Sequence, residues 1–118
     1  MKTFLAIYIG SDTGFAAAEW NSLNADERQK KEQDGMKEWG KWLETHKSSI
    51  VTMGGPLGKT KAISASGISD IKNQMAGYTI IEAESHEKAA QYFVGHPHFS
   101  IFPGDSVEVM ECLPIPGA

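Results

Sequence analysis

Two histidines on either side of one proline are the residues of this chain best suited to chemistry. In His96-Pro97-His98, two imidazoles that titrate near neutral pH lie two positions apart. On an extended backbone both rings would point to the same side, where they could act as acid or base, or bind a metal together with a third ligand. The alternative interpretation is a surface loop after a helix that Pro97 ends.

Two glutamates could bring carboxylates to the same place. Glu82 and Glu108 lie in segments that read as strands, and we expect these strands to be adjacent in the sheet. In a cavity, one of the carboxyls would favour its protonated form and could take part in proton transfer, whereas at a strand end both would be solvated. With His46, they are also the possible further ligands of a metal-dependent site, although we assign no metal site.

Aromatic side chains could form the wall of a pocket beside these polar groups. Trp39 shares a helical stripe with Met36 and Leu43, a spacing typical of core packing. Trp42 falls on a neighbouring stripe and suits a pocket as well as the core. The predicted ligand-binding residues are Tyr8, Trp42, His96 and His98. The candidates for a catalytic role are His96, His98, Glu82 and Glu108.

The size and charge of the chain limit the classes of function. With 118 residues it has the length of one domain, and we predict a single domain over residues 1–118. The 11 basic and 15 acidic residues give a formal net charge of −4, which lacks the basic excess that phosphate neutralisation needs. We therefore expect no nucleic-acid partner.

The N-terminal segment and the single cysteine indicate a cytoplasmic protein. Cys112 has no partner for an internal disulfide, which fits a reducing compartment. Residues 1–9 are apolar but too short to span a membrane, and residues 10–14 follow them without a convincing signal-peptide cleavage pattern. We interpret residues 1–9 as a strand followed by a turn, and expect no membrane partner.

The chain reads as strand, helix, strand pair, strand, helix, strand. Asn24 with Glu27 three residues later forms a capping-box pattern that predicts the start of a long helix, and Ser85 caps a second one that Gly95 and Pro97 stop. Residues 65–75 read as a polar excursion. The expected strands are residues 4–9, 49–53, 60–64, 78–84 and 107–112.

This order predicts a ferredoxin-like α+β fold, in which an antiparallel sheet carries both helices on one face. The other face would then be bare. Its strands carry apolar candidates, so we expect a second copy of the chain to cover it, as a homodimer that closes an α/β barrel. The candidates for this face are Tyr8, Met53, Ile80 or Ile81, and Met110.

The chain resembles the YCII-related proteins, which belong to the dimeric α/β-barrel superfamily. Residues 54–57 (Gly-Gly-Pro-Leu), 77–85 (Gly-Tyr-Thr-Ile-Ile-Glu-Ala-Glu-Ser) and 107–109 (Val-Glu-Val) look like the turn and two strands of that family. The subgroup named for an Asp-Gly-Pro-Phe motif is similar at three later positions, but Ile68 stands where its phenylalanine belongs, and the motif itself is replaced. The matching positions are Asp70, Lys72 and Gln74.

The resemblance implies a fold and a dimer more than an activity. Some family members pair a histidine of the first helix with an aspartate of an Asp-Pro step, a dyad proposed for acid–base catalysis. This chain has Trp39 and Gly40 near the first position and His96-Pro97 at the second. The dyad therefore cannot be carried over.

Three functions from different classes remain open at this point. The first is the binding of a small molecule, or an unassigned activity without a cofactor, in a cavity of the dimeric barrel. The second is a non-catalytic interaction module, in which the dimer is the functional unit. The third is a metal-dependent enzyme that uses His96 and His98.

Overall fold

A four-stranded antiparallel sheet forms the centre of the molecule. The computed structural model describes residues 1–10 and 15–117, so most of the turn expected at residues 10–14 lies outside the described part. The strand order is β2-β5-β1-β6, which is that of a ferredoxin-like fold, the fold class predicted from the sequence. These strands are β1 (Lys2–Ile9), β2 (Ile50–Pro56), β5 (Met75–Ala83) and β6 (Ser106–Glu111).

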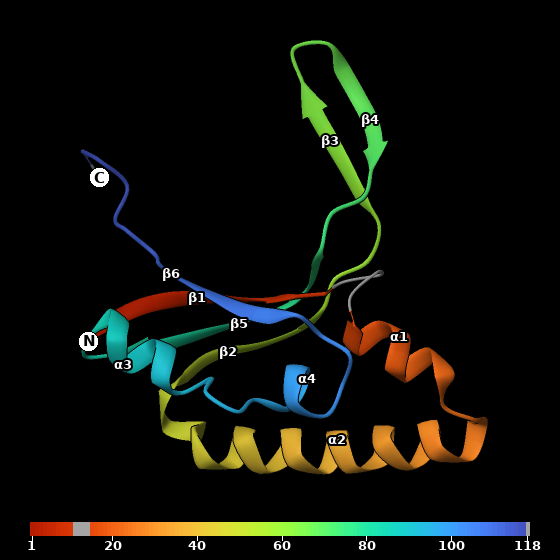
Figure 1. Cartoon of the computed structure of the whole chain (residues 1–118). Helices are drawn as coiled ribbons and strands as arrows, with labels where there is room; N and C mark the ends of the chain where they lie inside the picture. Colours follow the sequence, from red (N-terminus) through yellow and green to blue (C-terminus); the bar gives the residue numbers. More distant parts are fainter. Residues whose placement is uncertain (11–14, 118) are drawn as a thin grey trace.

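The helices cover one face of this sheet (Figure 1). The longest, α2, begins after Asn24, whose side chain accepts from the Glu27 amide while the Glu27 carboxylate accepts from the Asn24 amide, so the expected capping box is confirmed. Ser85 caps α3, also as expected. The helices are α1 (Phe15–Ser22), α2 (Ala25–Thr45), α3 (His86–Gln91) and α4 (Pro97–Ser100), with a 3-10 turn at Lys47–Ser49. No helix of the described residues combines the length and apolarity needed to cross a membrane.

Gly35 lies in the middle of α2, where glycine weakens a helix. It is buried because the ring of Phe102 rests on it, and a Cβ at this position would come within 2.5 Å of that ring. Phe102 follows α4, so the missing side chain lets α2 and the C-terminal part of the helix layer approach closely. This contact explains why α2 continues through a residue that disfavours it.

The two faces of β1 differ in what covers them. Phe4, Ala6 and Tyr8 point to the helices and belong to the buried core, together with Ile81 of β5. Because neighbouring side chains alternate, Leu5 and Ile7 point to the opposite face. The prediction that Tyr8 lies on the bare face is therefore wrong: its parity with Phe4 places it under the helices. The remaining buried members of the core are Trp42, Ala83, Ala89 and Phe93.

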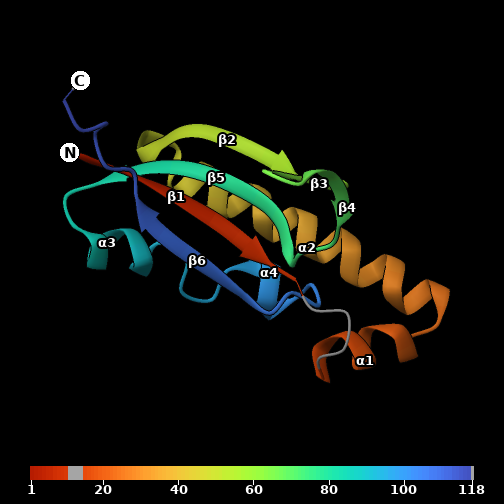
Figure 2. The ribbon, with the colours of Figure 1, turned by 90° about the horizontal axis from the view of Figure 1, so that it is seen from above.

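The bare face carries an apolar row across three strands. Leu5 pairs with Ile80 on one side and with Met110 on the other, so the three side chains lie next to one another. Glu82 of β5 and Glu108 of β6 share this face, since their partners Thr3 and Ile7 alternate with the buried residues of β1. Figure 2 views the sheet from this side, where the described elements leave it open.

A hairpin projects from one end of the sheet on the side away from the helices (Figure 1). Its strands are β3 (Thr60–Ser64) and β4 (Gly67–Ile71), which pair with each other in a separate two-stranded sheet. The polar excursion expected over residues 65–75 is thus largely a strand, which Gly67 opens at a φ of 118°. Ile63 of β3 pairs with Ile68 of β4 in this hairpin, and the two residues are 74% and 71% exposed.

Candidate functional site

A cavity of about 350 Å³ lies between α2, the sheet and the segment around α4. Gly77 faces Tyr8 across the β5–β1 pair, where a Cβ would come within 3.3 Å of the Tyr8 ring and 3.1 Å of the Gly55 carbonyl oxygen. Leu43 and Trp39 of α2 form the helical wall, so the stripe that sequence assigns to core also borders a cavity. The remaining lining includes Met36, Met53, residues 54–56, Ala76, Thr79, His98 and Phe102.

A chain of hydrogen bonds ends at Tyr8 on the floor of this cavity. The Thr79 hydroxyl donates to the Met53 carbonyl over 3.0 Å, and the Tyr8 and Thr79 hydroxyl oxygens are 2.8 Å apart. Since Thr79 has only one hydroxyl hydrogen, Tyr8 donates and Thr79 accepts. Burial raises the pKa of Tyr8 above its usual 10.0, although the Thr79 contact opposes this shift, so Tyr8 is neutral near pH 7.

His98 is held by the backbone at the other side of the cavity. Its Nε2 is 2.7 Å from the carbonyl oxygen of Ile9, and because a carbonyl only accepts, Nε2 carries the hydrogen. The ring is packed against Gly104, where any Cβ would overlap Nε2, Cε1 and the His98 carbonyl. These two contacts fix the tautomer and the position of an imidazole that is 8% exposed.

His96 lies behind His98 in an aromatic box. Its ring centroid is 4.5 Å from that of Trp39 and 4.7 Å from that of Trp42, with nearly perpendicular ring planes, and Tyr8 packs on another side. Its Nδ1 accepts from the His98 amide, so His96 caps α4. Burial, followed by repulsion from His98 and His46, lowers the pKa of His96 from 6.5 to about 4. It is therefore neutral at pH 7.

The histidine segment differs from both sequence interpretations. It is neither an extended pair nor a surface loop, because Pro97 starts the short helix α4 and both His96 and His98 are buried. Pro97 suits this position, since its missing amide hydrogen is not needed in the first helical turn. The two rings consequently have different surroundings, and of the two only His98 lines the cavity between α2 and the sheet.

The four predicted ligand-binding residues come together, but they do not all border the cavity. Tyr8 and His98 line it, whereas Trp42 is 8% exposed and belongs to the core. The Trp42 indole nitrogen donates to the Tyr92 carbonyl over 2.6 Å, which anchors α2 to the end of α3. Trp39 occupies the wall instead. The helical spacing could have indicated this stripe, but spacing alone does not separate core from cavity.

Glu82 and Glu108 lie away from these residues. The expectation that their strands are adjacent is wrong, because β1 runs between β5 and β6. Both carboxylates are on the bare face of the sheet, opposite the helices and both buried histidines. Within residues 1–10 and 15–117, no three histidine, cysteine, aspartate or glutamate side chains come together to hold a metal ion.

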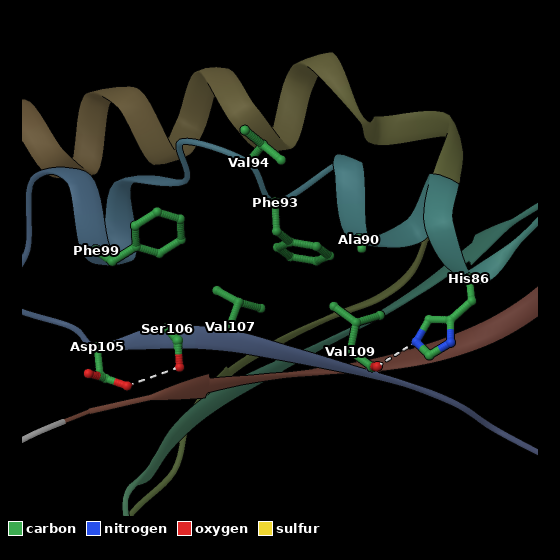
Figure 3. Close-up of a pocket in the computed structure, with 9 residues that line it drawn as sticks. All are labelled: His86, Ala90, Phe93, Val94, Phe99, Asp105, Ser106, Val107 and Val109. Carbon is green, nitrogen blue, oxygen red and sulfur yellow. Dashed lines mark hydrogen bonds between the residues drawn. The ribbon is translucent and has the colours of Figure 1, made fainter.

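A second cavity, of about 360 Å³, lies between α3, α4 and β6 (Figure 3). It contains a histidine, an aspartate and a serine, but Figure 3 has His86 at one end and Asp105 and Ser106 at the other. His86 Nε2 donates to the Val109 carbonyl over 2.7 Å, while the Ser106 hydroxyl donates to Asp105 over 3.1 Å. The three groups therefore do not form a catalytic triad.

The fold matches a solved structure, a 5-chloro-2-hydroxyhydroquinone dehydrochlorinase from Burkholderia phenoliruptrix AC1100 in complex with 2,5-dihydroxybenzoquinone. The match covers 92% of this chain and 90% of that chain, with a TM-score of 0.50 and 19% sequence identity. No protein-family model matches the sequence, and no curated protein matches it significantly. The ferredoxin-like α+β fold is thus confirmed, and membership of the YCII-related family stays a prediction.

Proposed function

We propose that this protein binds a small, largely apolar molecule in the cavity between α2 and the sheet. The observation that carries the proposal is the composition of the wall, in which aromatic and aliphatic side chains surround a few polar ones, among them Tyr8, Thr79 and His98. A concave, mostly apolar site with a few fixed polar groups is the usual character of a small-molecule site. Its volume of about 350 Å³ suits a compound of one ring.

The charges around the cavity favour a neutral compound. Among the described residues that border it there is no lysine, arginine, aspartate or glutamate. A carboxylate or phosphate would therefore lose its hydration without gaining a charged partner. The dehydrochlorinase of the same fold was solved with a dihydroxybenzoquinone, a compound of one planar ring, which is consistent with a ligand of this size. No cofactor is part of the proposal.

Two alanines provide a matched test of the location. Ala76 borders the proposed cavity and Ala90 borders the cavity beside β6, and both are exposed. We expect one-ring aromatic compounds, from toluene to 4-ethylphenol, to raise the melting temperature of the wild type and of Ala90→Trp. Ala76→Trp fills the proposed cavity and should abolish that response. An equal response of both variants, or none in the wild type, would contradict the proposal.

We also propose that the chain is a homodimer in which two bare sheet faces meet. The apolar row of Leu5, Ile80 and Met110 supports this arrangement, because a monomer rarely leaves such a contiguous surface in water. The β3–β4 hairpin rises on the same side and carries Ile63 and Ile68, which a second copy could cover. The dimer could itself be the functional unit of an interaction module.

Light scattering over a dilution series tests the dimer. We expect the mass of two chains down to micromolar concentration. A monomer that stays in solution when concentrated would contradict the dimer but not the cavity, because the proposed cavity is formed by residues of one chain.

A further inference from the structure

The hydrogen bonds around the cavity leave acceptors available at both fixed polar side chains. Tyr8 gives its hydroxyl hydrogen to Thr79, whose own hydrogen goes to the Met53 carbonyl. The remaining capacity of the Tyr8 oxygen is therefore that of an acceptor. Thr79 cannot supply a hydrogen to a ligand without giving up the Met53 carbonyl.

His98 also has an acceptor atom available, because its only ring hydrogen is already used in a hydrogen bond. Its one ring hydrogen in the neutral form is on Nε2 and is given to the Ile9 carbonyl. Nδ1 consequently has a free lone pair, and among the described residues no donor is within hydrogen-bond distance of it. Because His98 borders the cavity, a donor group on a bound ligand could approach this lone pair from the cavity.

The positions of both groups are fixed by more than their own rotamers. His96 accepts from the His98 amide and so sets the start of α4, while Gly104 allows the imidazole to lie directly against the backbone. Trp39 contacts Tyr8 and His98, with ring centroids 5.0 and 6.4 Å apart. A donor on a flat ligand packed against Trp39 would meet two preorganised acceptors.

We infer that the ligand of this cavity is a hydroxylated aromatic compound, a phenol, whose hydroxyl donates a hydrogen bond to His98 Nδ1 or Tyr8. This inference rests on the proposed function and specifies its ligand class. An aromatic ring matches the apolar and aromatic wall, and the hydroxyl matches the acceptors. An ether or a hydrocarbon of the same size would bind more weakly, because it would remove water from these acceptors without giving them a hydrogen-bond partner.

Two isomers test the inference directly. 4-Ethylphenol and 4-methylanisole contain the same atoms, but only the first has a hydroxyl hydrogen. We expect the phenol to bind about tenfold more tightly by calorimetry, the difference made by one buried hydrogen bond. Equal affinities would overturn the phenol inference and leave the cavity proposal intact. Binding of neither isomer, nor of toluene, would overturn both.

A variant assigns the preference to His98. His98→Phe keeps a planar ring at this position but has no nitrogen that can accept a hydrogen bond. We expect the ratio of the two affinities to fall from about tenfold to less than threefold. His46→Phe is the matched control, because His46 lies outside this cavity. A preference that persists in folded His98→Phe would exclude His98 as the acceptor.

Discussion

The two faces of the central sheet are built from the same strands and carry different chemistry. On the helix face, Phe4 is fully buried and Tyr8 is part of a hydrogen-bond chain beside a cavity. On the bare face, Leu5 lies in an apolar row that carboxylates flank. One face thus carries hydrogen-bonded polar groups beside a cavity, whereas the other presents apolar groups that nothing in the described part of the chain covers.

Because of this difference, ligand binding and dimerisation can be tested separately, although the hypothesis drawn from the sequence placed the cavity inside the dimer. A cavity on the bare face would exist only in a dimer, and every site residue would depend on assembly. The cavity on the helix face is complete in one chain, so ligand binding and association can be changed independently. The following variants test this separation, beginning with the largest expected effect.

The substitution Phe4→Ala should lower the free energy of unfolding by about 3–5 kcal/mol, because a fully buried ring leaves a cavity in the core. Leu5→Ala is the control on the opposite face. Its loss should grow as the protein is concentrated into the dimer, while the Phe4 loss stays constant. Denaturant titrations at two protein concentrations measure both, and an equal, concentration-independent loss would contradict different covers for the two faces.

His96 should make stability depend on pH. The unfolded chain binds a proton at this position below about pH 6.5, but the buried ring resists it until about pH 4. Its contribution is therefore complete above pH 6.5 and is lost as the pH falls towards 4, by about 3 kcal/mol in total.

Unfolding titrations from pH 7.5 to 4 measure this dependence. His96→Asn can still accept from the His98 amide and does not titrate, so its stability should fall less over the same window. Parallel curves for the variant and the wild type would show that His96 is not the group responsible.

A charge on the bare face should weaken the dimer without affecting the cavity. Ile80→Glu places a carboxylate between Leu5 and Thr52 in the sheet, and in an interface this carboxylate would lose its hydration without gaining a partner. The dissociation constant, measured by sedimentation, should rise about a hundredfold. Binding of 4-ethylphenol should be unchanged, and a parallel loss of binding would mean that the two functions are coupled.

Tyr8→Phe should have the smallest effect on stability, a loss of about 1 kcal/mol, because Thr79 then lacks one of its partners. Tyr78→Phe is the control, since Tyr78 lies on the alternate face of β5 and pairs with Ile7. Thermal unfolding compares the two. A larger loss for Tyr78→Phe would contradict the assignment of polar pairing to the helix face.

The fold could be predicted because local signals agreed with the topology. The capping box at Asn24, the cap at Ser85 and the apolar runs of β1 and β5 each specify one element, and their order allows few arrangements. The exceptions have local causes. The segment from Gly67 to Ile71 forms a strand with few apolar residues, because its partner β3 supplies the pairing.

Only part of the candidate site could be predicted. Tyr8 and His98 border the cavity, whereas Trp42 and His96, also predicted, do not. Which side of the sheet a side chain faces is not fixed by residue type, because a shift of one residue reverses every side chain. The surroundings of the two histidines depend on Pro97, which begins the short helix α4 between the buried His96 and His98. Gly104 and the Ile9 carbonyl fix His98 through backbone contacts that no residue pattern indicates.

A crystal structure of the protein with 4-ethylphenol is the measurement that tests the central claim most directly. We expect the ring to lie between Trp39 and the floor of the sheet, with its hydroxyl within hydrogen-bond distance of His98 Nδ1 or Tyr8. A ring bound instead on the bare face among Leu5, Ile80 and Met110, or in the cavity beside β6, would contradict it.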